Sequence, residues 1–571
     1  MEGESVEVQD AAENSSSVDR GIEEHKKRKF LRFLRFFGPA FFVSIGGIDP
    51  GNFTTDIEAG SKYGMSLLWV LLVATVIAVI VQVLAARIGI ATGQGLAGVC
   101  CEYYTQWISK TTFLVAFIAI ISTILACLLG GAVGLQMLTG APVAVTIIVC
   151  AGILWVSMFL HRLGARVLEL VVAAFLFSIS ICFSVELTLI EIHWEEVAKG
   201  FIPSNPGSEG LLVAVGLFGA CVMPHNIYLH SSLLAHDRHH RPAVSQQSER
   251  SCINKSLCWV QHKIERAGQS SMSELLQFSV IDSIVAFGIA FFVSVCLIII
   301  SAAAFFENNQ HEVVELQQAK VLLGGLLQRN AELGAVLFGI ALFVAGHSSA
   351  MSGVMAGRNI VSGFFPSRPR PLTNDHVLDL LHVLATVAIA FPITVISSDE
   401  HLDTNGAMSL SVNATFEEGT AVGDASTYLV IILTQVVLSL SLPAALIPLV
   451  RFCRDDAIVG SELKIGHPML VVSWVAVMFV CVVNFWLLGD LVTSLFSSAE
   501  SSDEGSMKET DVGSFAGGIL ICSLFACWVV FLGFLLFYPL RRKNISGNSR
   551  MYALAEVVED EEVDDDEDGQ L

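Results

Sequence analysis

Two short stretches decide the fold: residues 42–52 read FVSIGGIDPGN, and residues 217–226 read LFGACVMPHN. Each lies inside an apolar run and carries the pattern X-Pro-X-Asn, with Pro50 in the first stretch and Pro224 in the second. Proline removes a backbone N–H donor and clashes with the preceding helical turn, while glycine tolerates an unwound backbone. Both runs are therefore predicted to be pairs of half-helices separated by a break.

The chain around these breaks has the composition of a membrane protein. Of its 571 residues, 53% are hydrophobic and 15% are charged, whereas a soluble domain has about 25% charged residues. Crossing a bilayer takes about 17–25 apolar residues, and twelve runs in the sequence are long enough. These runs are predicted at roughly 36–64, 67–91, 113–138, 143–160, 168–190, 211–236, 277–304, 334–356, 377–397, 427–449, 468–492 and 514–538.

The two breaks occupy corresponding places in two five-span blocks. Their prolines lie 174 residues apart, in the first span of spans 1–5 and of spans 6–10. An odd number of spans inverts the second block, and paired broken helices in inverted repeats mark a midplane substrate site. Two ordinary proline kinks are the alternative. Kinks alone do not explain why Asp49 sits at the first break, because an Asp near a helix centre costs about 2.5–3.5 kcal/mol. The pattern indicates a secondary transporter.

This pattern predicts five segments. They are a disordered cytoplasmic tail at 1–35, the first inverted repeat at 36–190, the second repeat at 211–450, two further helices at 468–538, and a disordered acidic tail at 539–571. The acidic tail is expected to remain solvated because a block of like charges resists folding.

Positive charges predict the orientation. The formal net charge is -22, yet 27 of the 32 Lys and Arg residues lie in the tails, the predicted internal loops or the adjoining helix ends. Cytoplasmic loops carry such an excess, so both termini are expected in the cytoplasm. None of the 13 cysteines lies in a predicted external loop, which excludes external disulfides. We expect a monomeric, multi-pass protein of the plasma membrane or an endolysosomal or vacuolar membrane, in contact with lipid and without a nucleic-acid partner.

The side chains at the breaks suit a metal ion. Asp49 offers a charged oxygen, Asn52 a neutral oxygen and Met223 a thioether sulfur, beside backbone carbonyls that unwinding frees. Hard Mg²⁺ and Ca²⁺ prefer all-oxygen shells, whereas mixed oxygen and sulfur donors favour softer ions such as Mn²⁺, Fe²⁺ and Cd²⁺. A methionine in an apolar helix is otherwise usually gap-filling core, and that alternative for Met223 stays open.

At these residues the sequence resembles the Nramp (natural resistance-associated macrophage protein) family of divalent metal transporters. The resemblance rests on IDPGNFTTDIEAG at 48–60 and GACVMPHNIYLHS at 219–231. It is supported by LAARIGIATGQGLA at 84–97, GHSSAMSGVMAGRNIVSGF at 346–364 and TQVVLSLSLPAALIPL at 434–449.

The resemblance implies an all-α, LeuT-like core of two inverted five-helix repeats plus two further helices, twelve in total, with helices 1 and 6 broken at the midplane. It also implies a metal site that matches Asp49, Asn52, the carbonyl of Ala220 and Met223. Gln435 looks like the family glutamine that joins this shell in some conformations.

Proton coupling is implied for three residues of this chain: Asp49, His225 and His230. A lone histidine inside a membrane can instead be a satisfied core residue, and for His230 both readings stay open.

Several positions depart from the family pattern. A gapless reading of TILACLLGGA at 123–132 places Ile124 and Cys127 where the family usually carries an acidic pair that opens a proton route. Neither side chain can relay a proton as a carboxylate does. In the eighth predicted span and just after it, His347 and Arg358 replace the usual glutamines of the family. In the seventh predicted span, Asp282 replaces the usual glutamate.

We therefore expect a secondary transporter that moves Mn²⁺, Fe²⁺ and related ions (Cd²⁺, Co²⁺ or Zn²⁺) into the cytoplasm. The metal is a substrate, and no resident cofactor is expected. Protons are expected to accompany the metal. Weak coupling is an open alternative, because Ile124 and Cys127 stand where the family usually carries an acidic pair. A non-transporting metal sensor or receptor on the same fold is the second hypothesis. An enzyme is disfavoured because the sequence has no Walker, nucleophile-elbow or zinc-protease motif.

Overall fold

The computed structural model describes residues 38–159, 165–188, 190–205, 207–239, 272–306, 331–367, 374–399, 422–500, 523 and 525–541. The predicted tails lie outside these residues, apart from 539–541.

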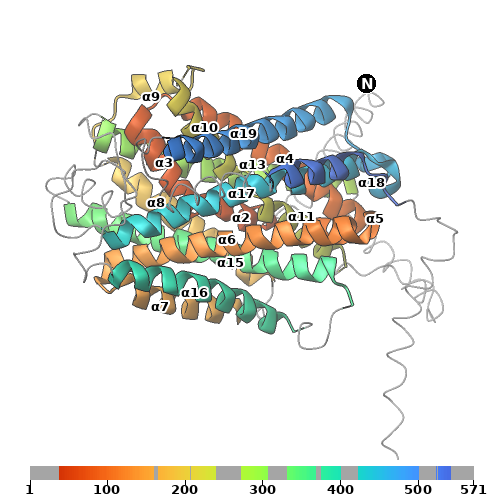
Figure 1. Ribbon diagram of the computed structural model, residues 1–571, viewed down its shortest axis with the longest axis horizontal. Coiled ribbons are helices and arrows are strands. Elements are labelled where there is room, and N and C mark those ends of the chain that lie inside the picture. Colours follow the sequence, from red (N-terminus) through yellow and green to blue (C-terminus); the bar gives the residue numbers. More distant parts are fainter. Residues whose placement is uncertain are drawn as a thin grey trace, which may run out of the picture.

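The described residues form helices and connections, without a strand (Figure 1). The helices are α2 (Pro39–Ser44), η1 (Ile45–Ile48), α3 (Pro50–Tyr63), α4 (Leu68–Thr92), α5 (Leu96–Tyr103), α6 (Gln106–Thr139), α7 (Val143–Met158), α8 (Ala165–Thr188), α9 (Trp194–Gly200), α10 (Gly207–Cys221), α11 (Pro224–His239), α13 (Met272–Ser301), η4 (Ala302–Phe306), α15 (Ala331–Phe364), α16 (Asp375–Asp399), α17 (Val422–Arg454), α18 (Asp456–Leu463) and α19 (His467–Glu500).

Within the described residues, each predicted span overlaps with helical structure. Within the described part of the chain, nine helices are long and apolar enough to cross a membrane. Three shorter apolar helices, Pro39–Ile48, Val143–Met158 and Phe525–Phe537, fall in the predicted first, fourth and twelfth spans. The all-α expectation is confirmed. The short helices α5, α9 and α18 lie in the connections between spans and were not predicted.

The outward faces of the helices are apolar. On α19, Val471, Val475, Val482 and Phe485 are 60 to 62% exposed. Water-soluble proteins rarely present such a continuous apolar surface. The same residues suit hydrocarbon, where helices satisfy all their own backbone hydrogen bonds.

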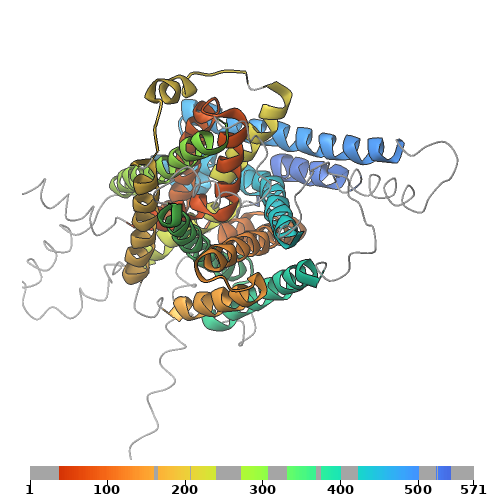
Figure 2. The same cartoon turned by 90° about the vertical axis from the view of Figure 1, so that its left-hand side faces the viewer.

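The long helices divide into two groups. In Figures 1 and 2, α6 and α15 run side by side with α7 and α16 beyond them, while α3, α4, α10 and α13 gather on the other side. Glycines bring α6 and α15 into backbone contact, because a Cβ on Gly346 would lie 2.6 Å from the Cys127 carbonyl oxygen. Small residues permit this close approach between membrane helices. The α6–α15 pair forms a wall against which the first broken helix packs.

The first prediction concerns this backbone contact. Gly346→Ala should destabilise the protein by about 1–3 kcal/mol, the usual cost of overpacking a core, because the backbone of α6 cannot yield as a side chain can. Thermal unfolding of the purified protein should show a lower midpoint. Gly152→Ala on α7 is the matched control, since a Cβ there meets nothing within 4 Å. Equal midpoints for the two variants would refute the close packing.

Candidate functional site

The first break lies between η1 and α3. Asp49 has an extended backbone (φ -85, ψ 167) and is the N-cap of α3, whose first residue is Pro50. Its Oδ1 accepts a hydrogen bond from the Asn52 N–H at 2.7 Å. Capping by Asp and proline at the first helical position are both favourable local choices. The sequence DPGN therefore both stops one half-helix and starts the next.

The second break repeats this arrangement. Helix α10 ends at Cys221, Val222 and Met223 are non-helical, and α11 begins with Pro224. In a continuous helix the N–H of residue 224 would bond to the carbonyl of Ala220, four residues earlier. Proline has no N–H, so the helix itself supplies no partner there for the Ala220 carbonyl. The predicted breaks in both helices are confirmed.

The two breaks face one another. A Cβ on Gly46 would lie 2.5 Å from Oδ1 of Asn226, so the amide of Asn226 rests directly on the backbone of the first break. Both amide atoms of Asn226 are buried without a hydrogen-bond partner among the described residues. Helix α15 also reaches this region, where the Ser349 hydroxyl donates to the Ile45 carbonyl at 2.6 Å.

Unpartnered oxygen atoms converge at this place. Asp49 and Asn52 are 0% and 2% exposed, yet Asp49 Oδ2 and Asn52 Oδ1 have no hydrogen-bond partner in the described part of the structure. Met223 is fully buried at the opposite break. Buried polar atoms in proteins nearly always have partners, and those that do not require an explanation. Buried acceptor oxygens at one break, with a buried thioether at the break that faces it, form a pattern that suits a cation.

Gln435 lies at the same site. A Cβ on Gly51 would overlap the Gln435 side-chain amide, and that amide is close enough to the Asp49 carboxylate to interact with it. Its Nε2 has no hydrogen-bond partner among the described residues. The structure therefore places α17 against the start of α3, with Gly51 leaving room for the amide.

His225 contacts α6 beside the second break. Its Nδ1 is 3.2 Å from the hydroxyl of Thr123, which itself donates to the Ala119 carbonyl at 3.0 Å. A hydroxyl whose proton is committed acts as an acceptor, so this arrangement favours the tautomer with the proton on Nδ1. Nε2 then carries a lone pair, and it has no partner in the described structure. Sequence reasoning gave no role to Thr123.

His230 lies away from the breaks. Its Nδ1 is 3.1 Å from Oε1 of Gln82 on α4, and both residues are buried. This contact ties α11 to α4 two turns beyond Met223. The assignment of His230 to proton coupling stays a prediction. The contact with Gln82 gives His230 a structural role as well.

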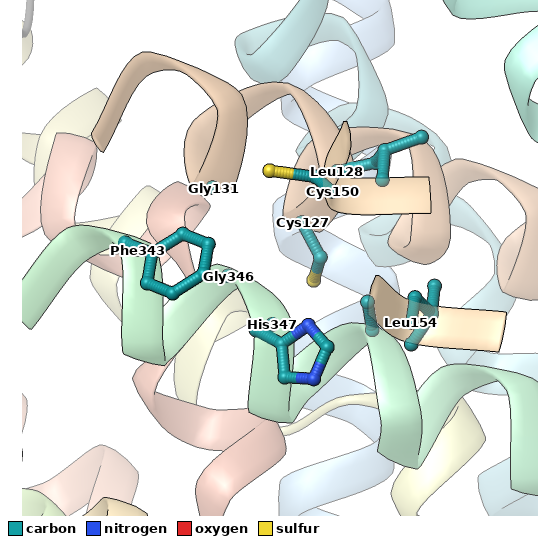
Figure 3. Close-up of a pocket in the computed structure, with 9 residues that line it drawn as sticks. Cys127, Leu128, Gly131, Cys150, Leu154, Phe343, Gly346 and His347 are labelled. Atoms are coloured by element: carbon teal, nitrogen blue, oxygen red, sulfur yellow. The ribbon is translucent and has the colours of Figure 1, made fainter. Parts of the chain in front are cut away.

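The two positions where the family usually carries acids lie in apolar surroundings on α6. Ile124 and Cys127 are fully buried on α6, where Ile124 packs against Gly353 of α15. Cys127 lines a small pocket between α6, α7 and α15. Figure 3 shows its thiol pointing toward the imidazole of His347, and His347 Nε2 lies 3.0 Å from the Ser157 hydroxyl. Soft and weakly polar groups thus occupy the place of the usual acids.

The two remaining departures make structural contacts. Arg358 pairs with Asp379 of α16 at 3.4 Å, and both side chains are at most 5% exposed. Asp282 of α13 accepts hydrogen bonds from the backbone N–H groups of Gly38 and Ala40, the latter at 2.9 Å. The Asp282 carboxylate therefore caps the first half of the broken helix from another helix.

Comparison with known families shows which family the chain belongs to. Residues 40–416 and 418–490 match the profile of the natural resistance-associated macrophage protein-like family. The chain belongs to the Nramp family.

Named relatives of this Nramp protein include a divalent metal cation transporter. It is 31% identical to the natural resistance-associated macrophage protein 2 homolog of Dictyostelium discoideum, over 86% of this chain and 69% of the relative. It is 32% identical to the divalent metal cation transporter MntH of Agrobacterium fabrum, over 81% of this chain and 88% of the relative. The family is thus one of metal transporters rather than enzymes.

A solved structure shows the same fold. A mutant of the manganese transporter of Eremococcus coleocola is 22% identical, with a TM-score of 0.68 over 88% of this chain and 95% of that one. The LeuT-like architecture expected from the sequence is confirmed at the level of the fold.

The second prediction concerns the cap from Asp282. Asp282→Ala should cost about 1–2 kcal/mol, as the loss of a helix cap does, because the Gly38 and Ala40 N–H groups lose their acceptor. Asp282→Asn keeps an acceptor oxygen and should cost less. Thermal unfolding midpoints of the two purified variants check the order. The cap assignment fails if the alanine variant is as stable as the asparagine variant.

Proposed function

We propose that this Nramp protein is a secondary transporter that moves divalent transition-metal ions, Mn²⁺ and Fe²⁺ foremost, across a membrane into the cytoplasm. The observation that carries the proposal is the pair of buried, unpartnered oxygens Asp49 Oδ2 and Asn52 Oδ1 at a break that faces a second break. A relative's name, divalent metal cation transporter, points to the same substrate class.

Each residue at the site has a distinct task in this proposal. Asp49 uses Oδ1 to cap α3 and keeps Oδ2 for the ion, whose charge it partly neutralises. Asn52 supplies a neutral oxygen, and Ala220 supplies the carbonyl that Pro224 leaves without a helical donor. Met223 supplies sulfur, and Gln435 completes the shell from α17. No single rigid element holds all five, so binding couples the helices to one another.

Selectivity follows from the donor types. A thioether binds hard Mg²⁺ and Ca²⁺ poorly and accepts softer first-row ions and Cd²⁺. Co²⁺ and Zn²⁺ fit the same argument. Alternating access would come from movement of the two broken helices against the α6–α15 wall.

Proton movement is proposed to be weakly coupled. Asp49 and His225 are the ionisable groups at the breaks, and His230 is engaged with Gln82. Helix α6 contributes Thr123, Ile124 and Cys127 instead of carboxylates. A pathway without carboxylates on α6 has few sites where a proton can rest.

The third prediction tests the site by uptake into proteoliposomes containing the purified protein. Asp49→Ala should reduce Mn²⁺ uptake at least about ten-fold, because loss of even an outer-shell partner costs 10–100-fold in metal affinity. Met223→Ala should weaken the preference for Mn²⁺ and Cd²⁺ over Ca²⁺ and Mg²⁺. Met158→Ala, which removes a buried methionine on α7, is the control and should retain that preference.

Two results of this assay would contradict the proposal. Unchanged Mn²⁺ uptake by Asp49→Ala would remove the metal site from the first break. Unchanged selectivity in Met223→Ala, with the Met158 control behaving as wild type, would make Met223 a core residue. Metal binding by wild type without any uptake would favour the sensor hypothesis.

The fourth prediction concerns the driving force. An inward proton gradient should raise Mn²⁺ uptake by less than about two-fold, since the α6 positions carry no carboxylate. Cys127→Glu should increase the dependence on the gradient if a carboxylate on α6 opens the route. The measurement compares initial Mn²⁺ uptake with and without an imposed pH difference. Strong stimulation of the wild type would overturn weak coupling while leaving metal transport intact.

A further inference from the structure

Helix α17, which carries Gln435, contains Pro443 in its interior. Proline has no N–H, so the helix itself supplies no donor there for the carbonyl of Ser439, four residues earlier. A carbonyl without a donor is costly inside a membrane, and an interior proline is tolerated where neighbouring helices supply the missing partner. The Ser439 carbonyl is therefore the point at which α17 needs support from another element.

Asn484 of α19 supplies this support. Its Nδ2 donates to the Ser439 carbonyl at 2.7 Å, and its Oδ1 accepts the hydroxyl of the same serine. Asn484 is fully buried, in the contact that α19 makes with α17. Polar side chains that hydrogen-bond across membrane helices hold those helices together. Because both polar atoms of the amide engage one residue, they fix α19 against α17 at that residue.

The next carbonyl of α17 also has a donor from outside the helix. The indole N–H of Trp528, in the helix Phe525–Phe537, donates to the Leu440 carbonyl at 3.0 Å. Asn484 and Trp528 belong to the eleventh and twelfth predicted spans, which follow the repeats predicted at 36–190 and 211–450. These two spans therefore converge on the turn of α17 that Pro443 weakens.

Ser439 links this turn to the candidate metal site. It follows Gln435 at the i, i+4 spacing, which places both residues on one face of α17. The amide of Gln435 lies against Gly51 at the start of α3. On α10, a Cβ on Gly219 would lie 3.7 Å from the Ser439 hydroxyl oxygen, and Gly219 directly precedes Ala220. The serine that α19 holds is thus a neighbour of the glutamine on one side and of the second broken helix on the other.

We propose that Asn484 and Trp528 are positioning residues for metal binding, which hold α17 so that the Gln435 amide reaches the ion. The inference rests on the proposed function, because it assigns the effect of both residues to the proposed metal site. An interior proline lets a helix bend, and two donors from outside fix the bend in one geometry. The last two spans thereby influence metal affinity, although neither residue is a ligand.

The test is a calorimetric titration of the purified full-length protein with Mn²⁺. Asn484→Leu keeps a side chain of similar size and removes both hydrogen bonds to Ser439. It should weaken Mn²⁺ binding about ten-fold, as the loss of groups that orient metal ligands does. Ser473→Ala on the same helix is the matched control, because its hydroxyl donates to the Met469 carbonyl of α19 itself at 2.6 Å. This control should bind Mn²⁺ as the wild type does.

Two double variants separate positioning from a general loss of stability. Pro443→Ala restores an N–H for the Ser439 carbonyl, so Asn484→Leu should weaken binding much less in that background. Asn484→Leu should also add little to Gln435→Ala, because effects that pass through one residue are not additive. Equal weakening with and without Pro443→Ala, or full additivity with Gln435→Ala, would overturn the proposal.

Asp49→Ala distinguishes this inference from the proposed function. If Asp49→Ala loses Mn²⁺ binding while Asn484→Leu keeps the wild-type affinity, only the positioning role is overturned. Wild-type binding by Asp49→Ala would overturn the metal site and the positioning role together. If Asn484→Leu is not monodisperse on size exclusion, Trp528→Phe replaces it as the test. That variant removes one donor and should weaken binding at least about two-fold, and an unchanged affinity would overturn the proposal.

Discussion

The two missing N–H groups of Pro50 and Pro224 are the constraint on which the site depends. Inside a membrane, a carbonyl without a donor has no water to bond to, so an interrupted helix must find partners nearby. Ser349 supplies one for Ile45, and the Asn52 amide supplies another for Gly47. In the proposed transport site, the carbonyls that remain are the ones available to an ion. The breaks would thus form a site because some of their backbone groups are satisfied and others are not.

The two carboxylate oxygens of Asp49 have different roles in the proposed site. One of its oxygens caps α3, where an acid also interacts favourably with the positive end of the helix dipole. Its other oxygen has no partner among the described residues. The cap fixes the direction of the carboxylate before any ion arrives, and a ligand held in place loses little freedom on binding. Gly51 contributes by its lack of a Cβ, since any side chain there would displace Gln435.

Sequence patterns predicted those features whose causes are local. Proline and glycine at the breaks, Asp49 at the first break and the twelve apolar runs are all visible along the chain. The contacts that join distant segments were not: Asp282 caps α2 from 244 positions away, and Thr123 meets His225 from 102 positions away. No periodicity encodes such pairs.

The apolar character of α6 has a physical consequence for the whole site. With Ile124 and Cys127 where acids were expected, the Asp49 carboxylate has no second carboxylate on the facing helix to compete with it for a cation or a proton. His225 is left with a neutral partner, Thr123, which fixes its ring orientation without stabilising an imidazolium as a carboxylate would. In the proposed transport cycle, the charge at the breaks therefore changes mainly when a metal ion binds or leaves. The absence of carboxylates on α6 would then both weaken the proton route and leave the metal ion as the main change of charge at the site.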